Sequence, residues 1–91
     1  MKPEVKLDKW VVIFFGSSPR LAGIVYGHPR LPDDDEIFTS LIENWTDTDT
    51  GTRVETKNTI YNLGEFGTEL RDRLEREGMT VGNTLVNPSA N

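Results

Sequence analysis

The stretch Lys9-Trp-Val-Val-Ile-Phe-Phe15 decides the fold class of this chain. It is rich in β-branched and aromatic residues, and it is too short for a typical helix. The turn-forming sequence Gly16-Ser-Ser-Pro19 follows it directly. Because its apolar residues do not alternate with polar ones, we expect a central strand that is buried on both faces.

Three further strands are predicted from runs that are bounded by turn residues, and they span residues 20–27, 36–45 and 52–61. Gly23 interrupts the first of them and indicates a bulge or a close backbone approach. A loop should precede the second, because Pro29 and Pro32 each remove a backbone donor. The polar segment 46–51 suits a hairpin connection to the third. In that strand we expect Val54, Thr56, Asn58 and Ile60 to share one face.

One amphipathic helix is predicted over residues 69–77, with Thr68 as its N-cap and Gly78 at its end. Three apolar residues at a spacing of four should face the sheet: Phe66, Leu70 and Leu74. We therefore expect a mainly β domain over residues 1–78 with one C-terminal helix, built as a small SH3-like antiparallel β-barrel or rolled sheet. The polar tail over residues 79–91 should be disordered or add an edge strand.

Composition excludes several classes of function. The chain of 91 residues has no cysteine, which excludes disulfides and thiolate zinc sites. Residues 1–32 hold five basic and two acidic side chains, a charge of +3, whereas residues 33–91 hold five basic and thirteen acidic ones, a charge of -8. We therefore expect no direct sequence-specific binding to nucleic acid.

The pattern of apolar residues also bears on location. The longest apolar run has six residues, far below the roughly 20 that a membrane-spanning helix needs. Acidic residues at Glu4 and Asp8, without an apolar signal-peptide core, favour the cytoplasm. We expect no contact with a membrane.

Five polar side chains form the candidate binding site: Arg20, His28, Arg30, Thr39 and Ser40. The two arginines and the histidine begin and follow the second strand, and the hydroxyls lie on the next one, so a hairpin would bring them together. Two guanidiniums with hydroxyls and an imidazole suit an anion or a nucleotide phosphate. The alternative is that both arginines neutralise the acidic run over residues 33–36, since exposed charge pairing is common.

Catalytic and metal chemistry find less support in the sequence. His28 is the only histidine, so it cannot build a multi-histidine metal site. A small enzyme that acts on a phosphorylated molecule could use His28 with the carboxylates of residues 33–35. The run over residues 33–36 could also bind a hard cation, but adjacent carboxylates on a loop usually form a solvated turn. We assign no catalytic residue, metal or cofactor.

Three segments carry a resemblance to known proteins: Gly27-His-Pro-Arg-Leu-Pro32, Glu36-Ile-Phe-Thr-Ser40 and Asn58-Thr-Ile-Tyr-Asn-Leu-Gly64. Through them the chain resembles small accessory proteins encoded by bacteriophages and prophages, over residues 10–64. The resemblance implies a protein that binds and inhibits a host or anti-phage defence component. We expect it to act stoichiometrically, by protein contact or by sequestering a nucleotide signal. Sheet edges that one short helix cannot cover also predict a homo-oligomer.

Overall fold

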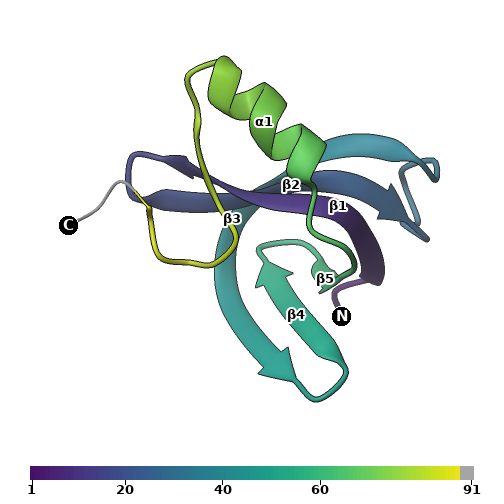
Figure 1. The fold of residues 1–91 in the computed structure, drawn as a ribbon. Helices are drawn as coiled ribbons and strands as arrows, with labels where there is room; N and C mark the ends of the chain where they lie inside the picture. Colours follow the sequence, from purple (N-terminus) through teal and green to yellow (C-terminus); the bar gives the residue numbers. More distant parts are fainter. Residues whose placement is uncertain (89–91) are drawn as a thin grey trace.

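The computed structural model describes residues 1–88 and confirms a mainly β chain with one helix. The elements in chain order are β1 (Glu4–Phe15), β2 (Ser18–Tyr26), β3 (Asp35–Thr48), β4 (Gly51–Thr56), β5 (Ile60–Leu63), α1 (Thr68–Arg76) and β6 (Thr80–Gly82). Figure 1 labels all of them except β6. No helix within residues 1–88 combines the length and apolarity that a bilayer crossing needs.

The strands form one sheet in the order β2-β3-β4-β5-β1-β6, and β1 also pairs with β2. The first five strands are therefore linked in a closed series of pairs. β1 and β5 run parallel, whereas the other neighbours are antiparallel. β3 changes its partner along its length: its residues up to Leu41 pair with β2, and Ile42 to Thr48 pair with β4. In Figure 1 the β3–β4 hairpin consequently projects away from α1.

A bulge bends β1 in its middle. Its register with β2 shifts between Asp8 and Val11, and Lys9 adopts a positive φ of 50° there. Gly23 faces this bend, and a Cβ atom at Gly23 would lie only 2.9 Å from the carbonyl oxygen of Asp8. The close backbone approach predicted for Gly23 is therefore confirmed.

The core has two layers, and β1 contributes to both. Val12 and Phe14 point into the cluster that the linked strands enclose, whereas Val11 and Ile13 belong to the cluster under α1. The second cluster also contains Leu70, Leu74 and Val81. β1 is thus buried on both faces, as predicted, and the predicted inner face of the helix is confirmed. β1 begins at Glu4, however, well before the predicted strand.

The strand predicted over residues 52–61 is wrong. β4 ends at Thr56 and β5 begins at Ile60, with a turn between them. The amide and the hydroxyl of Thr56 both donate to the carbonyl oxygen of Thr59, at 2.9 and 3.1 Å, and these bonds close the turn. The alternation therefore stops at Thr56, and Asn58 is exposed rather than on the inner face.

The predicted N-cap is wrong, whereas the predicted tail adds an edge strand, one of the two forms expected for it. Thr68 is the first helical residue, and Gly67 occupies the N-cap position without a side-chain hydrogen bond. Gly67 is required there because a Cβ atom would lie 2.2 Å from the carbonyl oxygen of Lys9. Beyond the predicted boundary at Gly78, β6 pairs with β1 as an edge strand. Residues 89–91 of the predicted tail lie outside the described residues.

Candidate functional site

A groove of about 1090 Å³ opens where β3 separates from the turn between β4 and β5. The loop after β2 forms a second wall, and the N-terminal residues form a third. Its lining consists of Met1, Lys2, Pro3, His28, Pro29, Arg30, Leu31, Ile37, Phe38, Thr39, Ser40, Thr56, Asn58, Thr59 and Tyr61. This lining is mixed, with apolar residues and several hydrogen-bonding side chains.

Four of the five predicted site residues line this groove: His28, Arg30, Thr39 and Ser40. Arg20 does not. It pairs in register with Ile13, which belongs to the core cluster under α1, so Arg20 lies on the face of the sheet that α1 covers. Its guanidinium donates to the carbonyl oxygen of Thr39 at 3.2 Å and lies 5.9 Å from the centre of the Phe15 ring. Arg20 therefore supports β3 from outside the groove.

Thr39 is buried, and its hydroxyl is used by the sheet. The register of β2 and β3 shifts between Arg20 and Ala22, opposite Thr39. The amide of Leu21 donates to Oγ1 of Thr39 at 3.0 Å, and that hydroxyl donates to the carbonyl oxygen of Ser40 at 2.8 Å. Since a buried amide without a partner is costly, Thr39 maintains the bulge and thereby the shape of the groove wall.

His28 and Arg30 form a small unit on the loop wall. The amide of Arg30 donates to Nδ1 of His28 at 3.0 Å. A neutral imidazole that accepts at Nδ1 carries its proton on Nε2, so its other nitrogen is a donor. Within residues 1–88 the guanidinium of Arg30 makes no hydrogen bond or ion pair. Both residues thus have donors available for an anion.

The acidic run after the loop does not neutralise the arginines. Oδ1 of Asp33 accepts from the amide of Gly27 at 2.8 Å, and Glu36 pairs with Arg73 of α1. A hydrogen bond to Asp34 raises the pKa of the Tyr26 hydroxyl. Among the described residues, neither Arg20 nor Arg30 pairs with this run, so the alternative based on charge pairing is not seen.

The groove contains no carboxylate, although the chain carries a net charge of -5. Its charged side chains are the ammonium of Lys2 and the guanidinium of Arg30. An anion beside Arg30 would therefore meet positive charge at short range. Beside Lys2 it would also lie near Glu43 and Glu55, which contact the ammonium.

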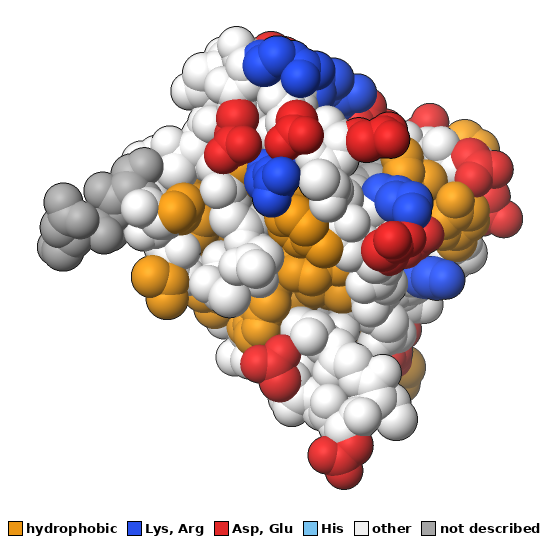
Figure 2. All heavy atoms as spheres, in the orientation of Figure 1, with side chains coloured by type: hydrophobic (Ala, Val, Ile, Leu, Met, Phe, Trp, Pro, Cys, Tyr) orange, Lys and Arg blue, Asp and Glu red, His pale blue; other side chains and the backbone are white. Residues whose placement is uncertain are grey.

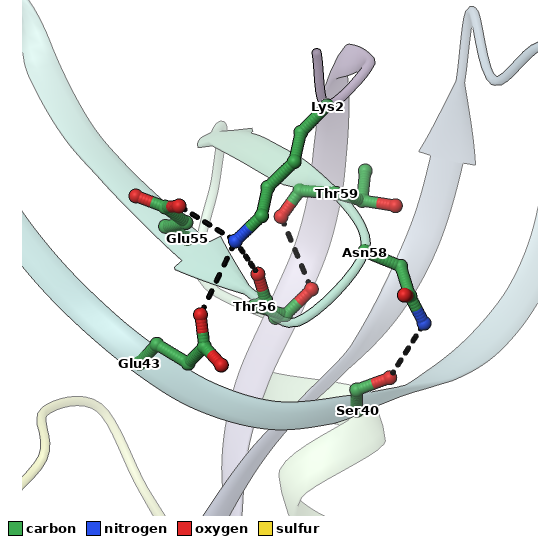
Figure 3. Close-up of polar contacts among 7 residues, drawn as sticks. All are labelled: Lys2, Ser40, Glu43, Glu55, Thr56, Asn58 and Thr59. Atoms are coloured by element: carbon green, nitrogen blue, oxygen red, sulfur yellow. Dashed lines mark hydrogen bonds and ion pairs between the residues drawn. The ribbon is translucent and has the colours of Figure 1, made fainter.

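Sequence reasoning missed the residues that the turn between β4 and β5 contributes. Asn58 reaches across the groove, and its Nδ2 lies 3.4 Å from Oγ of Ser40 on β3 (Figure 3). Burial raises the pKa of Tyr61, and a hydrogen bond with Thr59 offsets part of this effect. The Tyr61 hydroxyl therefore stays protonated at neutral pH. Only the failure of strict alternation after Thr56 could have indicated this turn.

Sequence reasoning also missed the role of the N-terminus. Figure 3 shows the ammonium of Lys2 at the centre of three contacts. It lies 2.6 Å from Oε2 of Glu55, 2.7 Å from the carbonyl oxygen of Thr56 and 3.2 Å from Oε1 of Glu43. The hydrogen bond to Glu55 raises the pKa of Lys2, and the same bond lowers the pKa of Glu55. These contacts attach the N-terminal wall of the groove to β3 and β4.

A second hollow, of about 730 Å³, lies beside the start of α1. Two of its cations are paired with carboxylates of the lining: Lys9 lies 2.5 Å from Glu65, and Arg73 contacts Glu36. Figure 2 shows acidic and basic side chains interleaved around α1, with hydrophobic side chains gathered beside them over the sheet. Because four carboxylates line this hollow (Glu36, Glu65, Glu69 and Asp72), it is a weaker candidate for an anion site.

The chain matches no protein-family model, no curated protein and no solved structure. The geometry of the groove is therefore the basis for any functional conclusion.

Proposed function

We propose that this protein is a non-enzymatic binding protein that holds an anionic small molecule of the nucleotide type in the groove around His28 and Arg30. The observation that carries the proposal is the lining itself: among residues 1–88 it contains no carboxylate, and the guanidinium of Arg30 has no partner there. In a chain with a net charge of -5, such a lining favours an anion over a cation or a neutral surface.

The donors around the groove fit a phosphate group. The guanidinium of Arg30 can bind two phosphate oxygens at once, which gives both affinity and orientation. Nε2 of His28 and the hydroxyl of Ser40 supply further donors from two walls. The partly buried side chains of Leu31 and Ile37 line the same groove and offer apolar surface for a base.

The role that we propose is sequestration of a nucleotide signal by a phage accessory protein, which would inhibit a host or defence component. Inhibition by direct protein contact is the other form of the same proposal. The linked series of five strands supports the narrower assignment as an SH3-like or related small β-barrel. Open strand edges support the proposed homo-oligomer.

The enzymatic alternative receives less support from the contacts of His28. Its Nδ1 accepts from the amide of Arg30, so that nitrogen is not available to accept a proton from a substrate. Asp33 and Asp34, the carboxylates that would assist it, bond to Gly27 and Tyr26 instead. These contacts favour a role for His28 as a hydrogen-bond donor.

Isothermal titration calorimetry with a panel of linear and cyclic nucleotides tests the proposal. Arg30→Ala should weaken binding about ten- to a hundredfold, because each hydrogen bond to a charged group contributes roughly 1.5–3 kcal/mol. Arg53→Ala is a matched control, since Arg53 is an exposed arginine that pairs with Glu4 outside the groove. Arg20→Ala should have a smaller effect than Arg30→Ala.

Two outcomes would contradict this proposal. If no nucleotide binds the parent protein at millimolar concentration, the groove is not a nucleotide site, and inhibition through protein contact becomes the leading hypothesis. If Arg30→Ala and Arg53→Ala weaken binding equally, the effect comes from general charge and not from the groove.

A further inference from the structure

The groove has two cationic side chains that come from different walls. Arg30 lies on the loop after β2, whereas Lys2 lies on the N-terminal segment beside β4 and β5. We infer that Lys2 is the second anion-binding residue of the groove, and that the ligand is a nucleotide with two separated phosphate groups. This inference rests on the proposed function, because it assumes that Arg30 binds the first phosphate.

The contacts of Lys2 show which of its partners a ligand could replace. A lysine ammonium has three N–H donors, and Lys2 has three acceptors: Glu55, the carbonyl of Thr56, and Glu43. The Glu43 contact is the longest, at 3.2 Å, and the Glu43 side chain is 51% exposed, against 33% for Glu55. Glu43 is therefore the partner that a second phosphate can displace at the lowest cost.

The exchange would conserve the contacts of Lys2. A phosphate oxygen would take the place of the Glu43 carboxylate, so the ammonium would keep three acceptors, and the exposed Glu43 would be solvated by water. The groove volume of about 1090 Å³ slightly exceeds the usual range for small-molecule sites, roughly 300–1,000 Å³, so it can accommodate a nucleotide with two phosphates. A nucleotide with one phosphate would engage only one of the two cations.

Calorimetry with adenosine 5′-monophosphate and adenosine 3′,5′-bisphosphate tests the inference. The parent protein should bind the bisphosphate at least tenfold more tightly than the monophosphate. Lys2→Met should abolish this preference, so that the two nucleotides bind with similar affinity. Lys2→Arg should keep the preference, and thermal melting of both variants checks that the fold is intact.

A variant of Glu43 gives the sharper readout, because a merely structural role of Lys2 predicts no gain. Glu43→Gln should tighten bisphosphate binding about three- to tenfold, since a neutral amide competes less well for the ammonium. The gain should vanish in the Lys2→Met background. Glu4→Gln is the matched control: Glu4 is exposed to a similar extent, at 48%, and pairs with Arg53 outside the groove. It should change affinity less than twofold.

The outcomes separate this inference from the proposed function. If Arg30→Ala weakens both nucleotides but the parent protein does not prefer the bisphosphate, the proposed function stands and the inference is wrong. The inference is also wrong if Lys2→Met weakens both nucleotides equally, or if Glu43→Gln gains no more than Glu4→Gln. If neither nucleotide binds the parent protein, both proposals are wrong for this ligand class.

Discussion

Replacing Trp10 should destabilise the protein more than replacing any exposed aromatic residue, because Trp10 joins the two halves of the fold. Its ring is 9% exposed and packs edge-on against Trp45 and Phe66, with centroid distances of 6.0 and 5.3 Å. Its Nε1 donates to the carbonyl oxygen of Gly64 at 3.0 Å. The residue thus connects β1 to β3 and to the segment that leads into α1.

The expected magnitude follows from these contacts. Truncation of a buried tryptophan or phenylalanine to alanine costs about 3–5 kcal/mol. A domain of 91 residues has a total stability of roughly 5–14 kcal/mol, so Trp10→Ala should remove a large part of it. Trp10→Phe should retain the ring packing and lose mainly the hydrogen bond to Gly64, at about 0.5–1.5 kcal/mol. Phe14→Ala, at a second buried ring of β1, should resemble Trp10→Ala.

Urea denaturation followed by far-ultraviolet circular dichroism measures these differences without relying on tryptophan fluorescence. The control is Phe15→Ala, because Phe15 is the last residue of β1 and is 51% exposed. Truncation of this ring should lower the free energy of unfolding by less than about 1 kcal/mol. If Trp10→Ala and Phe14→Ala shift the midpoint no more than Phe15→Ala does, the assignment of β1 as the central strand is wrong.

Three further predictions concern the bulge, the bend and the sheet edges. Thr39→Val should cost about 1–3 kcal/mol in urea denaturation because the buried Leu21 amide loses its acceptor, whereas Thr39→Ser should be nearly neutral. The hydrogen bond from the Glu65 amide lowers the pKa of Asp8 in the folded protein below its ordinary value of 3.8. The ionised Asp8 therefore stabilises the fold fully above pH 3.8, and this stabilisation is lost as the pH falls through the lowered pKa. Asp8→Asn should therefore melt below the parent at pH 7, and a gap that persists at pH 2 would contradict this cause. Light scattering should detect a dimer at tens of micromolar. The reason is that the edge of β3 opposite β4, beyond Leu41, pairs with no strand of residues 1–88. A strict monomer of 10.3 kDa would count against edge pairing.

The sequence was sufficient where local patterns determine local structure. The unbroken apolar run predicted a doubly buried strand, and the spacing of Leu70 and Leu74 predicted the inner face of the helix. Gly23 predicted that another backbone segment lies close to it, but not which one; that segment is the bend of β1 at Asp8. In each case the relevant contacts repeat with the period of the element, so a single sequence contains them.

The sequence was insufficient where distant segments determine the structure. The end of β4 at Thr56 depends on β5, which pairs in parallel with the start of β1. The alternation of side chains within residues 52–61 contains no information on the pairing of β5 with β1. The contacts of Lys2 are more remote still, because Glu43 and Glu55 lie 41 and 53 residues away in the chain. The sequence therefore indicated that side chains of the loop and of β3 lie together, as they do in the groove, but it did not indicate the opposite wall.

The positive character of the groove arises from where the acidic side chains are held rather than from an excess of basic ones. Glu36 pairs with Arg73 on α1, and Asp33 accepts from a backbone amide within its own loop. Glu43 and Glu55 are held by Lys2 and are not part of the lining, which contains no carboxylate of residues 1–88. Because these contacts belong to the folded sheet and its loop, they keep the acids out of the groove as long as the fold is intact. A net charge of -5 and an anion-binding groove are therefore compatible, since the contacts with Arg30 and Lys2 act at hydrogen-bonding distance and the remaining charge is screened by salt.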